Sequence, residues 1–322
     1  MLSLPDFEEK TVIFALLSRD DKLSFKNDNV VIKNDGVIKH QSSCYRLFAL
    51  FIVGHATITT GLLQRAKKFG FSIVLLNHNL SVYASWNTRT EGNTLLRKKQ
   101  YLYSELDIAH ILVRNKIAQQ IAALERIREK TLDLKEAIKQ LKTYQDRVFD
   151  DPPELKELLG LEGIASKVYF AQMFSDFNWS GRKPRVKHDI TNCLLDNGYT
   201  LLFNLIEALL NVYGFDTYKG FYHQEFYQRK SLVCDLVEPF RPIVDYRIRK
   251  AYNLGQIKEE DFYVHQKQYR LKIPSSPTYS NWILQELLSH KQEIFLYVQS
   301  FYRAFMRSKP ISEYPFFELQ PC

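Results

Sequence analysis

The sequence has little cysteine and no long apolar run. These two shortages argue against cysteine-based metal sites and membrane-spanning segments. The four cysteines are widely separated and form no CxxC pair: Cys44, Cys193, Cys234 and Cys322. This excludes a zinc site built from paired cysteines and is typical of reduced thiols in the cytosol. No uninterrupted apolar run reaches the roughly 18 residues needed to cross a bilayer. Because the N-terminus carries Asp6, Glu8 and Glu9, it lacks the basic start of a secretory signal. We therefore expect a soluble, cytoplasmic protein.

The motifs of several common enzyme classes are also missing. The patterns GxxxxGK[ST], GxGxxG, HExxH and GxSxG occur nowhere in the chain. ATP-driven chemistry and serine hydrolysis therefore lack the sequence features that they require.

Composition favours a globular protein with a polyanionic partner. The chain has 322 residues, of which 45% are hydrophobic and 25% charged, and this length suggests about two domains. Its 44 basic residues exceed 36 acidic ones, which gives a net charge of +8. Two basic clusters, at residues 97–99 and 181–187, are candidates for contact with phosphates, although such clusters are also common on ordinary solvated surfaces.

The pattern of apolar residues divides the chain in two. Short runs rich in Val, Ile, Phe and Tyr predict strands over residues 11–17, 30–32, 47–53, 71–77 and 81–86. One helix is expected among them, capped by Thr59 or Thr60 and stopped by Gly70. From Asn93 onward the apolar spacing is helical and little of the chain resembles a strand. We expect an α+β fold, with a β-rich domain over residues 1–90 and a mainly helical domain over residues 91–322.

Glu162 is a carboxylate in unusual surroundings. It lies in the segment LGLEGIAS among apolar and small residues, with Gly160 and Gly163 on either side. Glycines allow a close approach of the backbone to something packed or bound against it. The alternative, which the sequence leaves open, is an acidic residue stabilised near a helix N-terminus.

A second group of candidates lies further along the chain. His223 is surrounded by aromatic residues in the segment GFYHQEF, where a hydrogen-bonded core histidine is the common alternative. Asp235 and Glu238 are three residues apart, so on a helix both carboxylates lie on one face. Their neighbours are apolar, which makes surface solvation a poor explanation. Pro239 and Pro242 follow the pair and predict a helix end or kink.

These residue types suit one kind of chemistry. Two or three carboxylates with one imidazole form a hard ligand set that suits Mg²⁺ or Mn²⁺. In a basic protein such a set is a candidate for metal-assisted phosphoryl transfer, in which the metal polarises the scissile phosphate and activates an attacking oxygen.

Together these segments resemble a known family. The chain contains GLEG at residues 160–163, GFYH at 220–223 and RKSLVCDLVEPFRPIVD at 229–245. Weaker similarity extends to DITNCLLDNGY at residues 189–199, to RKKQY at 97–101 with Lys116 and to GHATIT at 54–59. The sequence resembles the CRISPR-associated spacer-acquisition integrases over nearly its whole length.

The resemblance implies an N-terminal β-domain that dimerises, joined to a helical catalytic domain. It implies a metal-dependent DNA endonuclease and integrase that inserts prespacer DNA into a CRISPR array by attack of a 3′-hydroxyl at the repeat ends. It also implies an Mg²⁺ or Mn²⁺ site formed by Glu162, His223 and Glu238, with Asp235 either a further ligand or the residue that orients His223. The implied partners are prespacer and leader–repeat duplex DNA, and a small companion protein that bridges a pair of homodimers.

Basic residues near this site are expected to follow the DNA backbone without reading its sequence. The candidates are Arg182, Lys183, Arg185 and Arg229. Two other functions remain open on the sequence: a structure-specific metal nuclease that cuts branched DNA without integrating it, and a non-catalytic DNA-binding scaffold. The scaffold predicts that the three ligand candidates do not converge in space.

Overall fold

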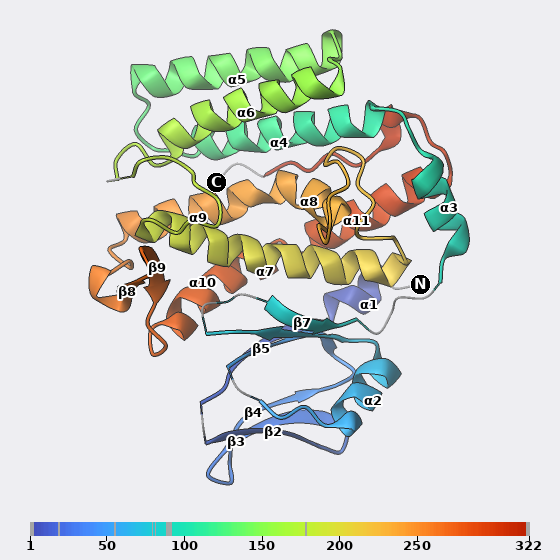
Figure 1. Cartoon of the computed structure of the whole chain (residues 1–322), viewed down its shortest axis with the longest axis vertical. Helices are drawn as coiled ribbons and strands as arrows, with labels where there is room; N and C mark the ends of the chain where they lie inside the picture. The colour runs from blue at the N-terminus through green and yellow to red at the C-terminus, as the bar shows by residue number, and fades with distance from the viewer. Residues whose placement is uncertain are drawn as a thin grey trace.

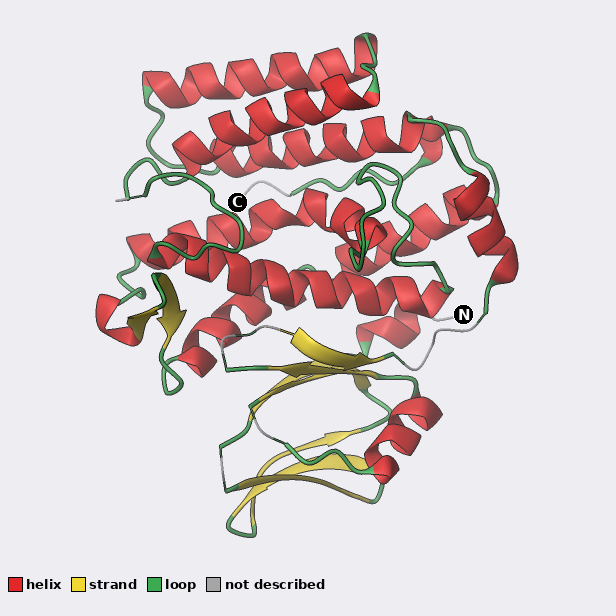
Figure 2. Ribbon diagram, viewed as in Figure 1, coloured by secondary structure: helices red, strands yellow, loops and turns green. Residues whose placement is uncertain are grey.

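The protein folds into a β-rich N-terminal part and a larger helical part (Figures 1 and 2). The structure is a computed structural model that describes residues 3–18, 20–54, 56–78, 80, 82–87, 92–177 and 179–319. The architecture confirms the expected α+β class. The expected domain boundary at residues 90 and 91 lies outside the described residues.

The N-terminal part contains two sheets. The elements are α1 (Leu4–Glu8), β1 (Thr11–Leu16), β2 (Asp21–Lys26), β3 (Asn29–Asn34), β4 (Val37–Ser43), β5 (Leu47–Val53), α2 (Thr60–Phe69), β6 (Ser72–Leu76) and β7 (Val82–Trp86). One sheet has the order β1-β5-β6-β7, in which β7 alone is antiparallel to its neighbour, and the other is an antiparallel β2-β3-β4 meander. All five predicted strands are present, whereas β2 and β4 were not expected. Ser81, at the start of the last predicted strand, lies outside the described residues.

Strand β5 is buried on both faces, which explains its uninterrupted apolar sequence. Phe48, Phe51 and Val53 belong to the core that the sheet shares with the helical part. Leu47 and Leu50 belong to a smaller core under α2 and the second sheet. The β-rich part is therefore packed against the helical part through a shared core.

Helix α2 begins and ends where its sequence predicts. The side chain of Thr59 accepts a hydrogen bond from the backbone N–H of Leu62, and Gly70 ends the helix with a φ of +69°. Left-handed backbone of this kind favours glycine, which has no Cβ to clash.

The helical part is built around a buried central helix. Its helices are α3 (Thr94–Leu102), α4 (Asp107–Glu125), α5 (Leu132–Asp150), α6 (Leu155–Met173), α7 (Ile190–Tyr213), α8 (Ser231–Val237), α9 (Arg241–Asn253), α10 (Ser276–Ser289) and α11 (Lys291–Met306). By length and composition α7 could cross a membrane, but 83% of its most apolar window is buried inside the protein, as in the core helix of a soluble fold. Helices α4, α5 and α6 form a layer at the top of Figure 1.

Two local features of the helical part bear on the predictions. A short 3₁₀ helix, Glu238–Phe240, separates α8 from α9, which confirms the predicted break at Pro239 and Pro242. A β-hairpin, β8 (Phe262–His265) and β9 (Gln268–Leu271), was not expected in this part of the chain.

Contacts of α1 join the two parts. The ring of Phe7 stacks on that of Phe295 in α11, with 4.4 Å between centroids. Lys291, at the start of α11, donates from Nζ to the carbonyl of Glu8 at 2.6 Å. The N-terminal segment thus fixes the sheet against α11.

Candidate active site

Two of the predicted carboxylates face one buried cation. Glu162 lies on α6, Glu238 begins the 3₁₀ helix after α8, and Lys116 lies on α4. The ammonium of Lys116 forms an ion pair with Oε1 of Glu162 and lies 2.6 Å from Oε2 of Glu238. Three segments that are distant in the sequence therefore meet around a single positive charge.

The charges of this group persist in the buried setting. Burial alone raises the pKa of Glu238, but the positive charges of Arg241 and Lys116 outweigh it and lower this pKa to about 2. Arg241 approaches the other oxygen, with 3.1 Å between Nε and Oε1. Burial lowers the pKa of Lys116, and Glu238 and Glu162 outweigh that effect and raise it. Glu238 therefore stays ionised and Lys116 stays protonated at neutral pH.

Asp235 organises the loop that carries His223. Its fully buried carboxylate accepts hydrogen bonds from the backbone N–H groups of Phe221 (2.6 Å), Tyr222 (3.1 Å) and His223 (2.8 Å). It also lies 2.7 Å from Nδ1 of His223. A Cβ on Gly220 would lie only 2.8 Å from this carboxylate, so the loop needs glycine there. Asp235 thus binds the loop and the imidazole with both of its oxygens.

The contact with Asp235 decides which nitrogen of His223 can bind a ligand. Because Nδ1 donates to the carboxylate, Nε2 is left as the nitrogen with an available lone pair. The histidine is therefore not an apolar core residue. Burial raises the pKa of Tyr222 beside it, and the charges of Glu162 and Glu238 raise it further.

The candidate ligands are neighbours but do not form a closed cluster. Within the part of the chain that the structure describes, no group of three or more His, Cys, Asp or Glu side chains could hold a metal ion as it stands. Lys116 occupies the position between the two glutamates instead. Oε2 of Glu238 is buried and accepts no hydrogen bond; its contact with Lys116 is an ion pair without hydrogen-bond geometry.

Two basic residues of this site, Lys116 and Arg241, were not predicted from the sequence. Lys116 appeared there only as part of the family resemblance, and Arg241 was not a candidate. The available signal for Lys116 was a lysine within a largely apolar helix, where a buried carboxylate partner is the common explanation. Its pairing with two distant glutamates depends on the packing of α4 against α6 and the 3₁₀ helix, which no local pattern reveals.

The four basic candidates for DNA contact lie in different settings. Arg182 is largely buried and binds Asn192 (3.0 Å) and Asp196 (2.6 Å), so its guanidinium anchors the loop. Lys183 and Arg185 are exposed on the same loop. Arg229 is half-buried beside the thiol of Cys234. Arg182, Lys183 and Arg185 therefore share one loop, on which only Lys183 and Arg185 of the three have exposed side chains.

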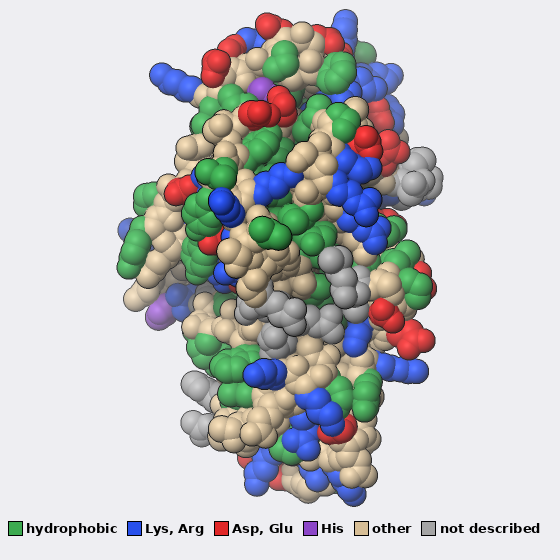
Figure 3. Space-filling model, turned by 90° about the vertical axis from the view of Figure 1, so that its right-hand side faces the viewer, with side chains coloured by type: hydrophobic (Ala, Val, Ile, Leu, Met, Phe, Trp, Pro, Cys, Tyr) green, Lys and Arg blue, Asp and Glu red, His purple; other side chains and the backbone are tan. Residues whose placement is uncertain are grey.

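The other basic cluster is mostly used within the protein. Arg97 donates to the carbonyl of Gly214 at 3.1 Å, and Lys99 donates to the carbonyl of Met306 at 3.2 Å. Lys98, between them, is exposed. Figure 3 shows Lys and Arg in several groups on this side of the molecule, interspersed with acidic side chains. Basic charge on this face is therefore distributed and not gathered into one patch.

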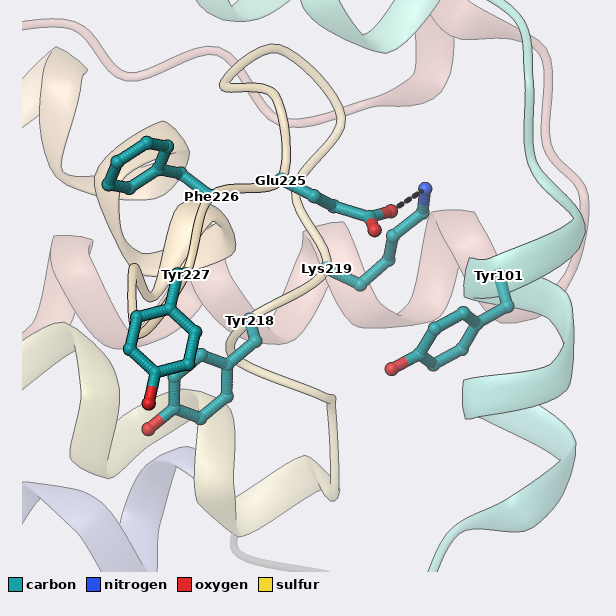
Figure 4. Close-up of a pocket in the computed structure, with 6 residues that line it drawn as sticks. All are labelled: Tyr101, Tyr218, Lys219, Glu225, Phe226 and Tyr227. Carbon is teal, nitrogen blue, oxygen red and sulfur yellow. Dashed lines mark hydrogen bonds and ion pairs between the residues drawn. The ribbon is translucent and has the colours of Figure 1, made fainter.

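An open aromatic pocket adjoins the loop of His223 (Figure 4). It has a volume of about 320 Å³ and is lined by Tyr101, Tyr218, Lys219, Glu225, Phe226 and Tyr227. Phe226 and Tyr227 are 74% and 83% exposed, three and four residues after His223. An ion pair of 2.6 Å joins Lys219 to Glu225 across the pocket. Exposed rings of this kind can stack on flat ligands.

Comparison with known proteins identifies the family. The family described as CRISPR associated protein Cas1 matches residues 15–281. CRISPR-associated endonuclease Cas1 1 of Thermodesulfovibrio yellowstonii is 34% identical over 281 residues, which cover 81% of this chain and 86% of that protein.

Solved structures share the fold at lower identity. TM1797, a CAS1 protein from Thermotoga maritima, has a TM-score of 0.78 at 18% identity, over 92% of this chain and 96% of that one. A casposase bound to integration product has a TM-score of 0.76 at 21% identity, over 96% of each chain. A chain of a Cas6-RT-Cas1–Cas2 complex reaches 0.81 at 24% identity, over 97% of this chain but only 36% of that longer one. The chain therefore belongs to the Cas1 family of CRISPR-associated endonucleases.

Proposed function

We propose that this protein is a divalent-metal-dependent DNA integrase that joins the 3′-hydroxyl of a prespacer strand to a phosphodiester at each end of a CRISPR repeat. Membership in the Cas1 family supports nuclease chemistry. A single observation carries the assignment of the site: Glu162 and Glu238 face one cation, beside a histidine whose Nε2 is available.

The donor groups fit Mg²⁺ or Mn²⁺. The position between Glu162 and Glu238 already accommodates a cationic group, and the buried Oε2 of Glu238 accepts no hydrogen bond. Carboxylates are the ligands these ions prefer, and one imidazole is acceptable to manganese. Glu162, Glu238 and Nε2 of His223 would hold the ion. When bound, it would stabilise negative charge on the phosphate oxygens and activate the attacking hydroxyl.

The remaining residues of the site position these ligands. Asp235 fixes the tautomer and the orientation of His223. Arg241 holds Glu238 from its other oxygen and keeps it ionised. Transesterification needs in-line geometry and electrostatic stabilisation more than covalent help from side chains, and a preorganised group of this kind supplies both.

The test is strand transfer with a labelled prespacer and a leader–repeat duplex, in the presence of Mn²⁺, Mg²⁺ or EDTA. Glu162→Gln, His223→Ala and Glu238→Gln should each abolish joining while leaving DNA binding largely intact. Glu207→Gln, which removes a buried carboxylate paired with Lys230 and not with Lys116, should retain joining. Cleavage without joining, with the companion protein present, would favour the nuclease. Full joining by any of the three site variants would refute the site.

The aromatic pocket suits the unpaired end of the attacking strand. Exposed Phe226 and Tyr227 follow His223 closely, so a base stacked on them would bring its strand near the site. We expect Tyr227→Ala to weaken joining of prespacers with single-stranded 3′ ends more than joining of blunt prespacers. Equal effects on both substrates would contradict this role.

An exposed sheet edge suits self-association. β7 is the edge strand of the larger sheet, and its Tyr83 and Trp86 are 54% and 46% exposed. Exposed aromatic edges are typical of interfaces. We propose a homodimer through this edge, with a small companion protein bridging two dimers. Light scattering should give a dimer for the wild type and a monomer for Tyr83→Glu with Trp86→Glu; an unchanged dimer would exclude this edge.

A further inference from the structure

We propose that Lys116 is a built-in cation that competes with the divalent metal for Glu162 and Glu238 and is displaced when the metal binds. The inference rests on the proposed metal site, and it concerns what keeps that site assembled before metal arrives. It assigns Lys116 as a positioning residue of the reaction.

The contacts of Lys116 are those that a bridging ion would need. Its ammonium pairs with Oε1 of Glu162 and with Oε2 of Glu238, one oxygen from each carboxylate. Ser166 also donates to Oε1 of Glu162 at 2.9 Å, and it fixes that oxygen from the same helix. A divalent ion held by both glutamates would compete with the ammonium for the same pair of negative charges, so we expect one cation to replace the other there.

Arg241 is not an equivalent competitor. It approaches Oε1 of Glu238, the oxygen that Lys116 does not contact, and it has no ion pair with Glu162. Arg241 can therefore remain in place when the shared position changes its occupant. Only Lys116, among the cations described here, joins the two glutamates.

Burial makes the cation necessary. The side chains of Lys116, Glu162 and Glu238 are 13%, 20% and 8% exposed, so water screens the two negative charges poorly. Without a cation between them, the carboxylates would repel each other and draw apart. The lysine therefore stabilises the metal-free site, and removing it leaves a repulsion between the carboxylates that bound metal would relieve.

The exchange also places a free ammonium at the site. Lysine carries its charge on a flexible four-carbon stem, so Lys116 can leave the glutamates without movement of α4. The anion that the proposed reaction brings there is the target phosphodiester. Metal binding would thus release Lys116 from its ion pairs with the two glutamates and leave its ammonium free to contact the DNA phosphate.

The experiment measures Mn²⁺ binding by titration calorimetry and thermal unfolding with and without Mn²⁺. Lys116→Met removes the competitor, and Lys116→Gln keeps a hydrogen-bond donor in case the methionine variant does not fold. The matched control is Lys230→Met, because Lys230 forms a 2.5 Å ion pair with buried Glu207 but contacts only one carboxylate. Glu162→Gln shows whether bound Mn²⁺ occupies this site.

We expect both Lys116 variants to unfold at a lower temperature than the wild type without metal, to bind Mn²⁺ roughly tenfold more tightly and to gain more stability from it. Lys230→Met should lose stability without any gain in affinity. Suppose that the wild type binds Mn²⁺, that Glu162→Gln abolishes this binding and that both Lys116 variants bind Mn²⁺ no more tightly than the wild type. This result would overturn the displacement of Lys116 by metal but leave the metal site itself intact. Absence of Mn²⁺ binding in every protein would overturn the metal site as well.

Discussion

Nδ1 of His223 and Oδ1 of Asp235 are 2.7 Å apart, and the same carboxylate binds three consecutive backbone N–H groups of the histidine loop. One side chain thereby sets the loop path and the imidazole tautomer together. Changes that keep the shape of the carboxylate but alter its hydrogen bonding should separate these two roles.

Asp235→Asn should reduce strand transfer by about 10- to 100-fold, the usual effect of removing a group that orients a metal-binding histidine. The amide keeps an oxygen for the loop N–H groups, but it cannot accept from both the loop and Nδ1 as the carboxylate does. Asp235→Ala should in addition lower the unfolding temperature, because three buried N–H groups lose their acceptor. Rates from the joining assay and thermal melts of both variants check this. Equal activity of wild type and Asp235→Asn would remove the histidine-orienting role.

Two glycines in α6 have no packing reason to be glycine. A Cβ added to Gly160 or Gly163 would meet no atom within 4 Å, although glycine inside a helix costs about 0.5–1 kcal/mol relative to alanine. We expect Gly160→Ala and Gly163→Ala to raise the free energy of unfolding by about that amount and to lower strand transfer, because DNA at Glu162 would press against this surface. Denaturant unfolding and the joining assay measure the two effects.

The control for these glycines is Gly198 in α7. There a Cβ would lie 2.4 Å from Cγ1 of Val244, so Gly198→Ala should destabilise the protein. Variants at residues 160 and 163 that gained stability and kept full activity would show that nothing approaches α6 closely during the reaction.

The sequence predicted those elements whose ends are marked by capping or helix-breaking residues. Helix α2 was predictable because Thr59 and Gly70 cap it, and the 3₁₀ break because Pro239 follows Glu238. Strand β4 was missed because its residues are mostly polar and exposed, so they lack the apolar run of a buried strand. The β8–β9 turn was missed because Gln266 and Lys267 adopt positive φ angles of 50° and 61°, where Asn or Gly is the usual signal.

The sequence could identify only those residues of the candidate site that lie in segments resembling the family. Glu162, His223 and Glu238 were named from their surroundings and from family resemblance, and the structure brings them near one another. The place of Lys116 between the glutamates, and the ion pair that holds Arg182 to Asp196, depend on tertiary packing. Spacing along the chain carries no information about such pairs.

Asp245 should give stability an unusual dependence on pH. Burial raises its pKa to about 6, although hydrogen bonds from Tyr199 and Tyr169 and the charges of Arg241 and Arg182 oppose the shift. Because its pKa exceeds the unfolded value of 3.8, the folded state binds more protons between these pH values, and stability falls as pH rises through this window. The loss should reach the order of 3 kcal/mol and be absent in Asp245→Asn.

Denaturant unfolding from pH 4 to pH 7 measures this slope. Asp261 is a control whose effect on stability has the opposite pH dependence. Hydrogen bonds from Ser275 and Tyr279 lower its pKa despite partial burial, so its contribution to stability is lost as pH falls below the unfolded value of 3.8. Asp261→Asn should therefore keep the wild-type slope between pH 4 and 7. A wild-type curve parallel to that of Asp245→Asn would mean that Asp245 is not protonated in the folded state.

The basic loop over residues 181–187 should divide into one anchor and two DNA contacts. Lys183→Gln and Arg185→Gln should each make the plot of log affinity against log salt less steep by about 0.9, the value for one lost phosphate contact on duplex DNA, with little change in stability. Arg182→Gln should leave the slope unchanged and destabilise the protein by about 3 kcal/mol, because it leaves largely buried Asp196 without its ion-pair partner. Binding measured at several salt concentrations, together with denaturant unfolding, separates the two groups. A flatter salt dependence for Arg182→Gln in a fully stable protein would mean that its guanidinium leaves Asp196 to bind DNA.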